Sequence, residues 1–329
     1  MADILFSKAT GLNDSVYGKA YAPIKMVIEK RAEAFEQQSV LPILYNQERS
    51  ENFAETITSM TTMRGLQPVS EGGAYPTDGF CEGYSKTLEH VTWKDQFAVS
   101  KEMIEDDKIL NLKQQPSAFT AAAYRTKEMF GCALLTGATA TSISFKGQSF
   151  DTTAADGKAL FSKEHPSFHT SKVQSNLFSN EFSDSVLAYV ETEMQNFADD
   201  DDNPLGVAPD TIVIPNNAIL KKTVFATIGA DKDPATSNNG FNYQFGRWNV
   251  LVCPYWVTSG NPYIIMSSSY NRDSIGAVWY DRVPLTVRVD EDKTNDNMIW
   301  RGRARYSAGF NDWRAFAMGG VTGGTDVTK

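Results

Sequence analysis

The chain has 329 residues, of which 41% are hydrophobic and 22% charged, and its 40 acidic and 31 basic side chains give a formal charge of −9. These proportions exclude a disordered or collagen-like chain. The acidic balance also argues against sequence-specific DNA binding, which usually depends on a basic surface. A chain of this length can bury the core of one large or two modest domains.

The cysteines and the apolar runs bear on where the protein is made. Cys81, Cys132 and Cys253 show no CxxC spacing, which predicts free thiols in a cytosolic product instead of a disulfide framework. The N-terminal residues lack the basic start and apolar run of a signal peptide. No segment approaches the roughly 18 apolar residues of a membrane span. We therefore expect a soluble protein made in the cytoplasm, without membrane contact.

The first hundred residues predict a helix and a long hairpin. Apolar residues at helical spacing predict an amphipathic helix over residues 15–38. Residues 65–83 hold five glycines and two prolines, a composition typical of a protruding loop. Alternating apolar residues over 87–99 predict a strand, so residues 56–99 form an extended hairpin with a Gly-rich tip. A short helix follows, with Ser100 as its N-cap.

The clearest helix pattern covers residues 116–135, because Pro116 suits a first helical turn and Gly137 suits a helix end. Another amphipathic helix is predicted over 183–197. The remaining predicted elements are short strands at 143–145 and 173–178, a buried strand at 211–214, a helix at 216–228, strands at 249–255 and 263–266, a hairpin with strands 285–290 and 299–310, and a flexible polar tail at 319–329.

Histidine is rare, and its placement gives little support to an enzyme. Glu164, His165 and His169 have a spacing that a zinc site could use, and they keep a metal-dependent hydrolase as an alternative. Pro166 opposes it, because proline disfavours a helix that places both rings on one face. His90 lies in the return strand of the hairpin, where a structural role is favoured. The chain also lacks a nucleophile elbow, a phosphate-binding loop and a dinucleotide-binding fingerprint.

A run of four aspartates, Asp199, Asp200, Asp201 and Asp202, stands out in the second half of the chain. It lacks the alternating ligands, the central glycine and the closing glutamate of an EF-hand, so a solvated acidic loop is the favoured interpretation. Such a loop would repel symmetry copies of itself unless ions or basic neighbours neutralised it.

Arg301, Arg303 and Arg305 alternate along the last predicted strand and form a basic stripe on one of its faces. Two interpretations are about equally supported. The stripe contacts phosphates or the acidic groups of a neighbouring molecule, or it pairs within its own hairpin with Asp290 and Asp292.

Three segments carry a family resemblance. Residues 97–107, FAVSKEMIEDD, resemble a strand-to-helix turn ahead of a long spine helix at 112–137. Residues 157–166, GKALFSKEHP, and 175–177, SNL, carry a Leu-Phe…His-Pro…Ser-Asn-Leu signature. Residues 303–314, RARYSAGFNDWR, resemble a C-terminal strand pair. In this order they resemble the major capsid proteins of tailed bacteriophages with the Hong Kong 97-like fold, in particular the Mu-type head-subunit branch.

The resemblance implies an α+β capsid fold and a structural role. The implied parts are an N-terminal arm at 1–50, an extended loop at 51–99 lying over a neighbouring subunit, a peripheral domain with the spine helix and a β-hairpin at 100–180 and 282–329, and an axial α/β domain at 181–281. Copies of the chain would form hexamers and pentamers of an icosahedral head around non-specifically held double-stranded DNA. Scaffolding, portal and cement proteins are further implied partners, and the implied location is the virion, after synthesis in the bacterial host cytoplasm. No catalysis, metal or cofactor is implied.

On this map, candidate site residues fall into three groups. They are the loop-tip interface of Leu66, Val69, Gly72, Gly73, Tyr75, Pro76 and Phe80, the axial acidic loop of Asp199 to Asp202 near a symmetry axis, and a peripheral basic stripe of Arg301, Arg303, Arg305 and Arg314. The tip has no lysine, which argues against an isopeptide cross-link. The fold is expected to start near residue 15 without a helical pre-segment, so assembly would need a separate scaffold or none. An encapsulin-like nanocompartment is the alternative with the same fold.

Overall fold

The computed structural model describes residues 4–8, 17–60, 66–77, 79, 82–106, 109–170, 172–229, 231, 241–256, 258, 260–292, 294–295 and 297–327. The helices are α1 Tyr17–Glu36, α2 Leu41–Leu44, α3 Lys101–Glu105, α4 Ile109–Thr136, α5 Asp184–Gln195, α6 Ala218–Gly229, α7 Ser268–Asp273 and the short 3₁₀ turn Trp313–Ala315. The strands are β1 Leu5–Lys8, β2 Asn46–Arg49, β3 Ala54–Met60, β4 Glu82–Glu89, β5 Val91–Val99, β6 Ser142–Phe145, β7 Gln148–Asp151, β8 His165–Pro166, β9 Val173–Gln174, β10 Thr211–Pro215, β11 Asn249–Cys253, β12 Tyr263–Met266, β13 Ala277–Asp292, β14 Asn297–Phe310 and β15 Phe316–Gly319. The mixture of helices and mainly antiparallel strands confirms the α+β class.

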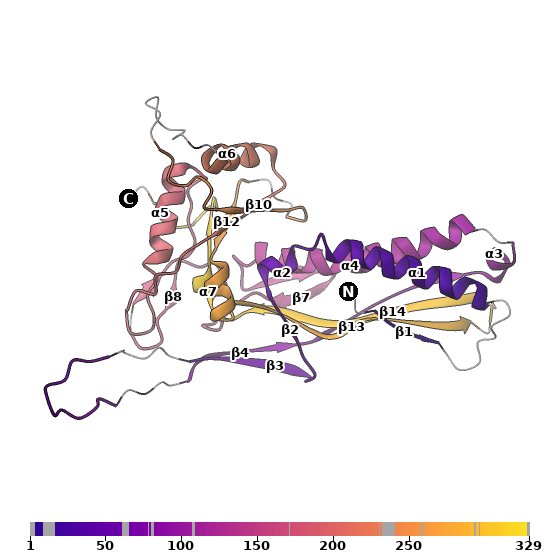
Figure 1. Ribbon diagram of the computed structural model, residues 1–329, viewed down its shortest axis with the longest axis horizontal. Coiled ribbons are helices and arrows are strands. Elements are labelled where there is room, and N and C mark those ends of the chain that lie inside the picture. Colours follow the sequence, from indigo (N-terminus) through magenta and orange to yellow (C-terminus); the bar gives the residue numbers. More distant parts are fainter. Residues whose placement is uncertain are drawn as a thin grey trace.

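The larger sheet is built on the predicted C-terminal hairpin, now β13 and β14. Burial alternates near the hairpin turn, whereas Ala277–Tyr280 and Tyr306–Phe310 are buried along their whole length. The strand order is β1-β13-β14-β5, and β2 also pairs with β13. Helix α4 lies against one face of this sheet, and α1 runs alongside α4 (Figure 1). The close approach depends on Gly302, since a Cβ there would lie 2.3 Å from the ring of Phe119 on α4.

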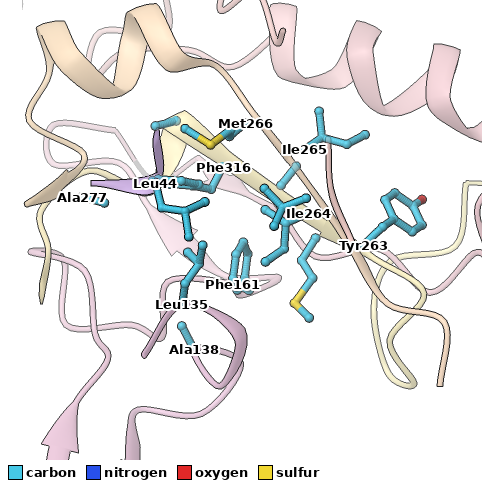
Figure 2. Packing of buried hydrophobic residues seen from close by; sticks show 14 of the residues in the cluster. Leu44, Leu135, Ala138, Phe161, Tyr263, Ile264, Ile265, Met266, Ala277 and Phe316 are labelled. Atoms are coloured by element: carbon cyan, nitrogen blue, oxygen red, sulfur yellow. The ribbon is translucent and has the colours of Figure 1, made fainter. Parts of the chain in front are cut away.

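A second sheet has the strand order β11-β10-β12-β15. Strand β10 is buried along its whole length, as its apolar sequence between prolines predicts. The sheet shares one core with the end of α4: Leu135, Phe161, Ile264 and Phe316 belong to the same buried cluster (Figure 2). Helix α5 begins where predicted, because the Ser183 side chain accepts a hydrogen bond from the Val186 amide at 3.3 Å.

The predicted extended hairpin is confirmed for β3 and β4, whereas residues 91–99, predicted as part of its return strand, belong to the larger sheet. Strands β3 and β4 pair with each other, and the chain then turns at His90 into β5 of the larger sheet. His90 is buried between the hydroxyls of Ser50 at 2.8 Å and Ser307 at 3.0 Å. Burial and the nearby Arg282 lower the pKa of His90, which favours the neutral ring at this junction. Residues 66–77 project away from the rest of the described chain (Figure 1).

Three further expectations about the limits of elements are wrong. Helix α4 begins at Ile109, ahead of the starts predicted at residue 116 from the pattern and at residue 112 from the resemblance. Pro116 does not end the helix, because it removes only one helical hydrogen bond and α4 still packs along α1. The fold does not start near residue 15, since β1 pairs in parallel with β13. The last residues are not a free tail either: the Thr325 amide donates to the Leu177 carbonyl at 2.7 Å, and the Ser179 amide donates to the Thr325 carbonyl at 2.9 Å.

Candidate functional site

The tip of the hairpin is an exposed apolar loop. Leu66 and Tyr75 are fully exposed and Val69 is more than half exposed, although such side chains are normally covered. The tip closes with a turn in which the Gly73 amide donates to the Ser70 carbonyl at 2.8 Å, and Gly72 takes φ +78°, a left-handed conformation that favours glycine. Pro76 is exposed too, and Phe80 lies outside the described residues.

The base of the same hairpin is firmly attached to the body. The Lys86 ammonium is buried and contacts the Asp151 carboxylate and the Thr153 hydroxyl beside β7. Tyr84 packs edge-to-face on Phe168, with ring centroids 5.1 Å apart. A rigid stalk therefore presents an apolar tip that gains no cover from the described residues of its own chain.

The arginine stripe is part of a broader basic face. Arg301, Arg303 and Arg305 lie on the face of β14 opposite α4, since the intervening Gly302 packs on Phe119. The register places Lys94 of β5 and Arg288 of β13 beside them, two cations that the sequence analysis did not group with the stripe. The alternation of side chains along β5 and β13 would have placed Lys94 and Arg288 on this face if the strand order had been known.

The predicted pairing within the hairpin is confirmed for Arg301 only. Its Nη1 donates to Asp290 at 2.8 Å, whereas Asp292 accepts a hydrogen bond from the Thr294 amide in the turn. Among the described residues, Arg305 Nε and Arg282 Nη1 are buried without a hydrogen-bond partner. Burial and the neighbouring cations Arg282 and Arg303 lower the pKa of Arg305. Asp290 also lies 3.7 Å from Arg288 Nε, so one carboxylate is shared by two of the five cations of this face.

Arg314 does not belong to this face, which corrects the sequence-based grouping. Its guanidinium donates to the Ala198 carbonyl at 2.9 Å and contacts Asp200 at 3.3 Å and Asp312 at 3.5 Å. Burial alone would lower the pKa of Arg314, but these two carboxylates hold the pKa above its ordinary value. The strand ends at Phe310, and the following turn carries Arg314 to the acidic loop instead.

Two of the four carboxylates of the acidic loop, Asp200 and Asp202, pair with cations of their own chain. Asp199 is buried and accepts hydrogen bonds from the amides of Asp201 at 2.9 Å and Asn203 at 2.8 Å. Asp200 lies 3.3 Å from Arg314, Asp201 lies 3.3 Å from His169, and Asp202 lies 3.6 Å from Lys172. A fully solvated loop is therefore the wrong description, and the basic neighbours that the sequence analysis required are present.

The histidines do not form a metal centre. His165 is fully buried, with Nδ1 2.6 Å from Asp156 Oδ2 and Nε2 3.2 Å from Asn176 Oδ1, and its ring stacks on Trp313 at 4.2 Å. His169 instead points to the acidic loop. Within the described part of the chain, no three His, Cys, Asp or Glu side chains are arranged to hold a metal ion. The Leu-Phe…His-Pro…Ser-Asn-Leu residues thus build a buried hydrogen-bond network.

Cys132 and Cys253 are buried free thiols whose sulfur atoms are 2.7 Å apart. Both are enclosed by the shared core, and Cys81 lies outside the described residues. None of the helices in the described ranges is long and apolar enough to cross a membrane.

Comparison with known proteins identifies the family. A model of the phage capsid protein family matches residues 84–319, which is most of the chain. The chain belongs to the phage capsid protein family. The family match supports a major capsid protein, the structural subunit of a phage head shell, and it does not distinguish the Mu-type branch, which stays a prediction. A search of curated proteins found no match.

Solved phage capsids confirm the fold of this capsid protein. The procapsid of bacteriophage JBD30 matches with a TM-score of 0.52 at 12% identity, over 93% of this chain and 75% of that chain. A structure from Mycobacterium phage Patience matches with a TM-score of 0.53 at 11% identity, over 97% of this chain and 92% of that chain. These likenesses establish the Hong Kong 97-like capsid fold.

Proposed function

We propose that this capsid protein assembles with copies of itself into hexamers and pentamers of an icosahedral head that encloses double-stranded DNA. The observation that carries the proposal is the exposed apolar tip on an anchored hairpin, because a neighbouring copy would cover it. Many such modest contacts sum to a stable shell. The role is structural and needs no catalysis or cofactor. Scaffolding, portal and cement proteins are the other proposed partners, the virion is the proposed location, and the bacterial host cytoplasm is the proposed place of synthesis.

The proposed parts are the arm at 1–50, the extended loop at 51–99, the peripheral domain at 100–180 and 282–329 and the axial domain at 181–281, with three adjustments. Strand β5 at 91–99 and residues 277–281 of β13 both pair with β14, so we assign them to the peripheral sheet. Strand β15 at 316–319 pairs with β12, so we assign it to the axial sheet.

The test is electron microscopy of the sedimentable native particles, combined with the ratio of absorbance at 260 and 280 nm. We expect icosahedral particles rich in nucleic acid. Icosahedral particles that never contain nucleic acid would favour the encapsulin-like alternative. A small oligomer that stays in the supernatant would contradict shell assembly altogether.

We also propose that the basic face binds an acidic surface of a neighbouring copy. This face consists of Lys94, Arg288, Arg301, Arg303 and Arg305. The hairpin base packs on the same side of the sheet, because Leu88 lies against Gly309 and His90 against Ser307. The loop tip of a second copy offers suitable charge: residues 65–83 contain Glu71, Asp78 and Glu82 and no basic residue. Charge complementarity therefore supports a protein partner at this face, and binding of DNA phosphate is the other outcome of the test below.

A charge exchange tests this pairing. We expect Arg301→Glu/Arg303→Glu to reduce shell yield about tenfold or more, because like charges then meet across the interface. Adding Glu71→Lys/Glu82→Lys to the same chain should restore part of the yield, whereas the exposed control Lys163→Glu should have no effect. Yield is measured by sucrose-gradient sedimentation. Unchanged yield with reduced DNA content would instead assign the face to DNA.

A further inference from the structure

Two of the three cysteines meet in the core although they are 121 positions apart in the sequence. Cys132 lies on α4, one turn before its end, and Cys253 is the last residue of β11. Their side chains are 0% and 1% exposed, and their sulfur atoms are 2.7 Å apart. Thiols that only fill core space would lie farther apart, because even carbon atoms in contact are about 3.5–4.0 Å apart. The pair is therefore closer to the spacing of a disulfide, which is about 2.05 Å.

The surroundings make Cys253 the more reactive of the two thiols. Hydrogen bonds from the Cys132 thiol and from the amides of Tyr255 and Trp256 lower the pKa of Cys253. The contact with Cys253 and burial in the core raise the pKa of Cys132. Because the thiolate is the reacting form of cysteine, Cys253 ionises first and Cys132 stays protonated beside it.

The two cysteines connect parts of the fold that belong to different sheets. Helix α4 packs along the larger sheet, whereas β11 lies at the edge of the second sheet and pairs, among the described strands, with β10. Cys253 is opposite Pro215 in this pairing, and proline has no amide hydrogen to donate to a neighbouring strand. A bond between Cys132 and Cys253 would therefore secure the end of an edge strand to the helix of the other sheet.

We propose that Cys132 and Cys253 form a redox modification site, at which a small peroxide converts the two thiols into a disulfide. The Cys253 thiolate attacks one oxygen of hydrogen peroxide and becomes a sulfenic acid, and the departing hydroxide takes up the proton that Cys253 released. The Cys132 sulfur then attacks the Cys253 sulfur, and the sulfenic hydroxyl leaves with the Cys132 proton as water. In total, two thiols and one peroxide give one disulfide and two waters, and the two sulfur atoms lose two electrons to the peroxide.

The enclosure of the pair determines both the oxidant and the effect. A small oxidant is required, because it must reach the sulfur atoms through brief local openings of the core. The disulfide would join positions far apart in the sequence and restrict the unfolded chain, so we expect it to raise Tm by on the order of 5 °C. The inference goes beyond the proposed assembly and does not depend on it, since both cysteines belong to one chain.

Peptide mapping tests the bond directly. One sample of the purified full-length chain is treated with hydrogen peroxide and another with dithiothreitol, and both are then denatured in N-ethylmaleimide. Mass spectrometry without reduction should find the Cys132 peptide linked to the Cys253 peptide in the first sample, and both peptides as maleimide adducts in the second. The proposal is wrong if peroxide leaves both thiols reduced, oxidises each of them separately to a sulfenic or sulfinic acid, or links either one to Cys81.

Thermal unfolding followed by tryptophan fluorescence tests the effect on stability. The Tm of the oxidised wild type should exceed that of the reduced wild type, and dithiothreitol should remove the difference. Cys132→Ala is the matched control: it retains the ten methionines, which peroxide also oxidises, and should show no reversible shift. Each chain is compared with itself, which cancels the cost of the cavity that alanine leaves. An equal reversible shift in both chains, or a linked peptide without a rise in Tm, would overturn the stabilising role.

Discussion

Deleting residues 68–80 is expected to leave a folded, soluble subunit that forms no stable shells. The pairing of β3 with β4 ends at Met60 and Glu82, so the deleted residues lie beyond the last strand contact. Residues 68–77 and 79 are exposed and make no contact with the core. The deletion should therefore change the free energy of unfolding by no more than about 0.5 kcal/mol. Assembly should fail because Val69 and Tyr75, the apolar groups offered to a neighbour, are gone.

Two measurements separate folding from assembly in this experiment. Urea unfolding followed by tryptophan fluorescence reports on the fold, and electron microscopy with gradient sedimentation reports on shells. Replacing the same residues with a Gly-Ser linker of equal length is the matched control, because it keeps the reach of the loop but removes its apolar side chains. A deletion variant that unfolds outright would mean that the segment belongs to the core, and one that forms normal shells would remove the tip from the assembly interface.

Asn176→Ala is expected to reduce the free energy of unfolding by about 4 kcal/mol, close to the range that prevents folding of a marginally stable domain. Asn176 is fully buried, and its Oδ1 accepts from the Ser162 amide at 2.9 Å. Its Nδ2 donates to the carbonyls of Leu160 at 2.8 Å and Phe316 at 3.0 Å. The substitution leaves all three buried backbone groups without this partner, and it also removes the oxygen that faces His165.

The measurement is chemical unfolding of the dissociated subunit, so that shell contacts do not add to the stability. Asn216→Ala is the control, because Asn216 is exposed and its loss should change the unfolding free energy by no more than about 0.5 kcal/mol. A loss below about 1 kcal/mol for Asn176→Ala would mean that water or a small shift satisfies the same backbone groups. In that case the Ser-Asn-Leu segment would not serve as the buried connection between residues 160–162 and strand β15.

Local pattern was sufficient for most of the secondary structure. The β13–β14 hairpin, the α5 helix with its Ser183 cap and the buried strand β10 follow from side-chain periodicity and capping, which act over a few residues. The exposed tip at residues 66–77 also follows from composition, because glycine and proline at this density cannot form a packed element. These features depend on neighbours in sequence, and they therefore needed no knowledge of the fold.

The candidate site depended more strongly on contacts between distant residues. Arg314 is nine positions from Arg305 in the sequence, yet it contacts Asp200 because the 3₁₀ turn at Trp313–Ala315 redirects the chain after β14. Lys94 joins the basic face only through the pairing of β5 with β14. A sequence pattern contains neither the direction of a turn nor the order of strands. The placement of Arg314 at the acidic loop and of Lys94 in the basic face could therefore not be predicted.

By itself, the sequence determined the α+β class, the extended hairpin with its apolar tip, the positions of most helices and strands and the resemblance to phage capsid proteins. The tertiary structure alone decided which charges meet, that helix α4 continues through Pro116, and that Cys132 contacts Cys253. The physical reason is the same in each case. Periodicity and turn chemistry are set within a few residues, whereas ion pairing, packing along α1 and the contact of Cys132 with Cys253 are set by groups far away in the chain.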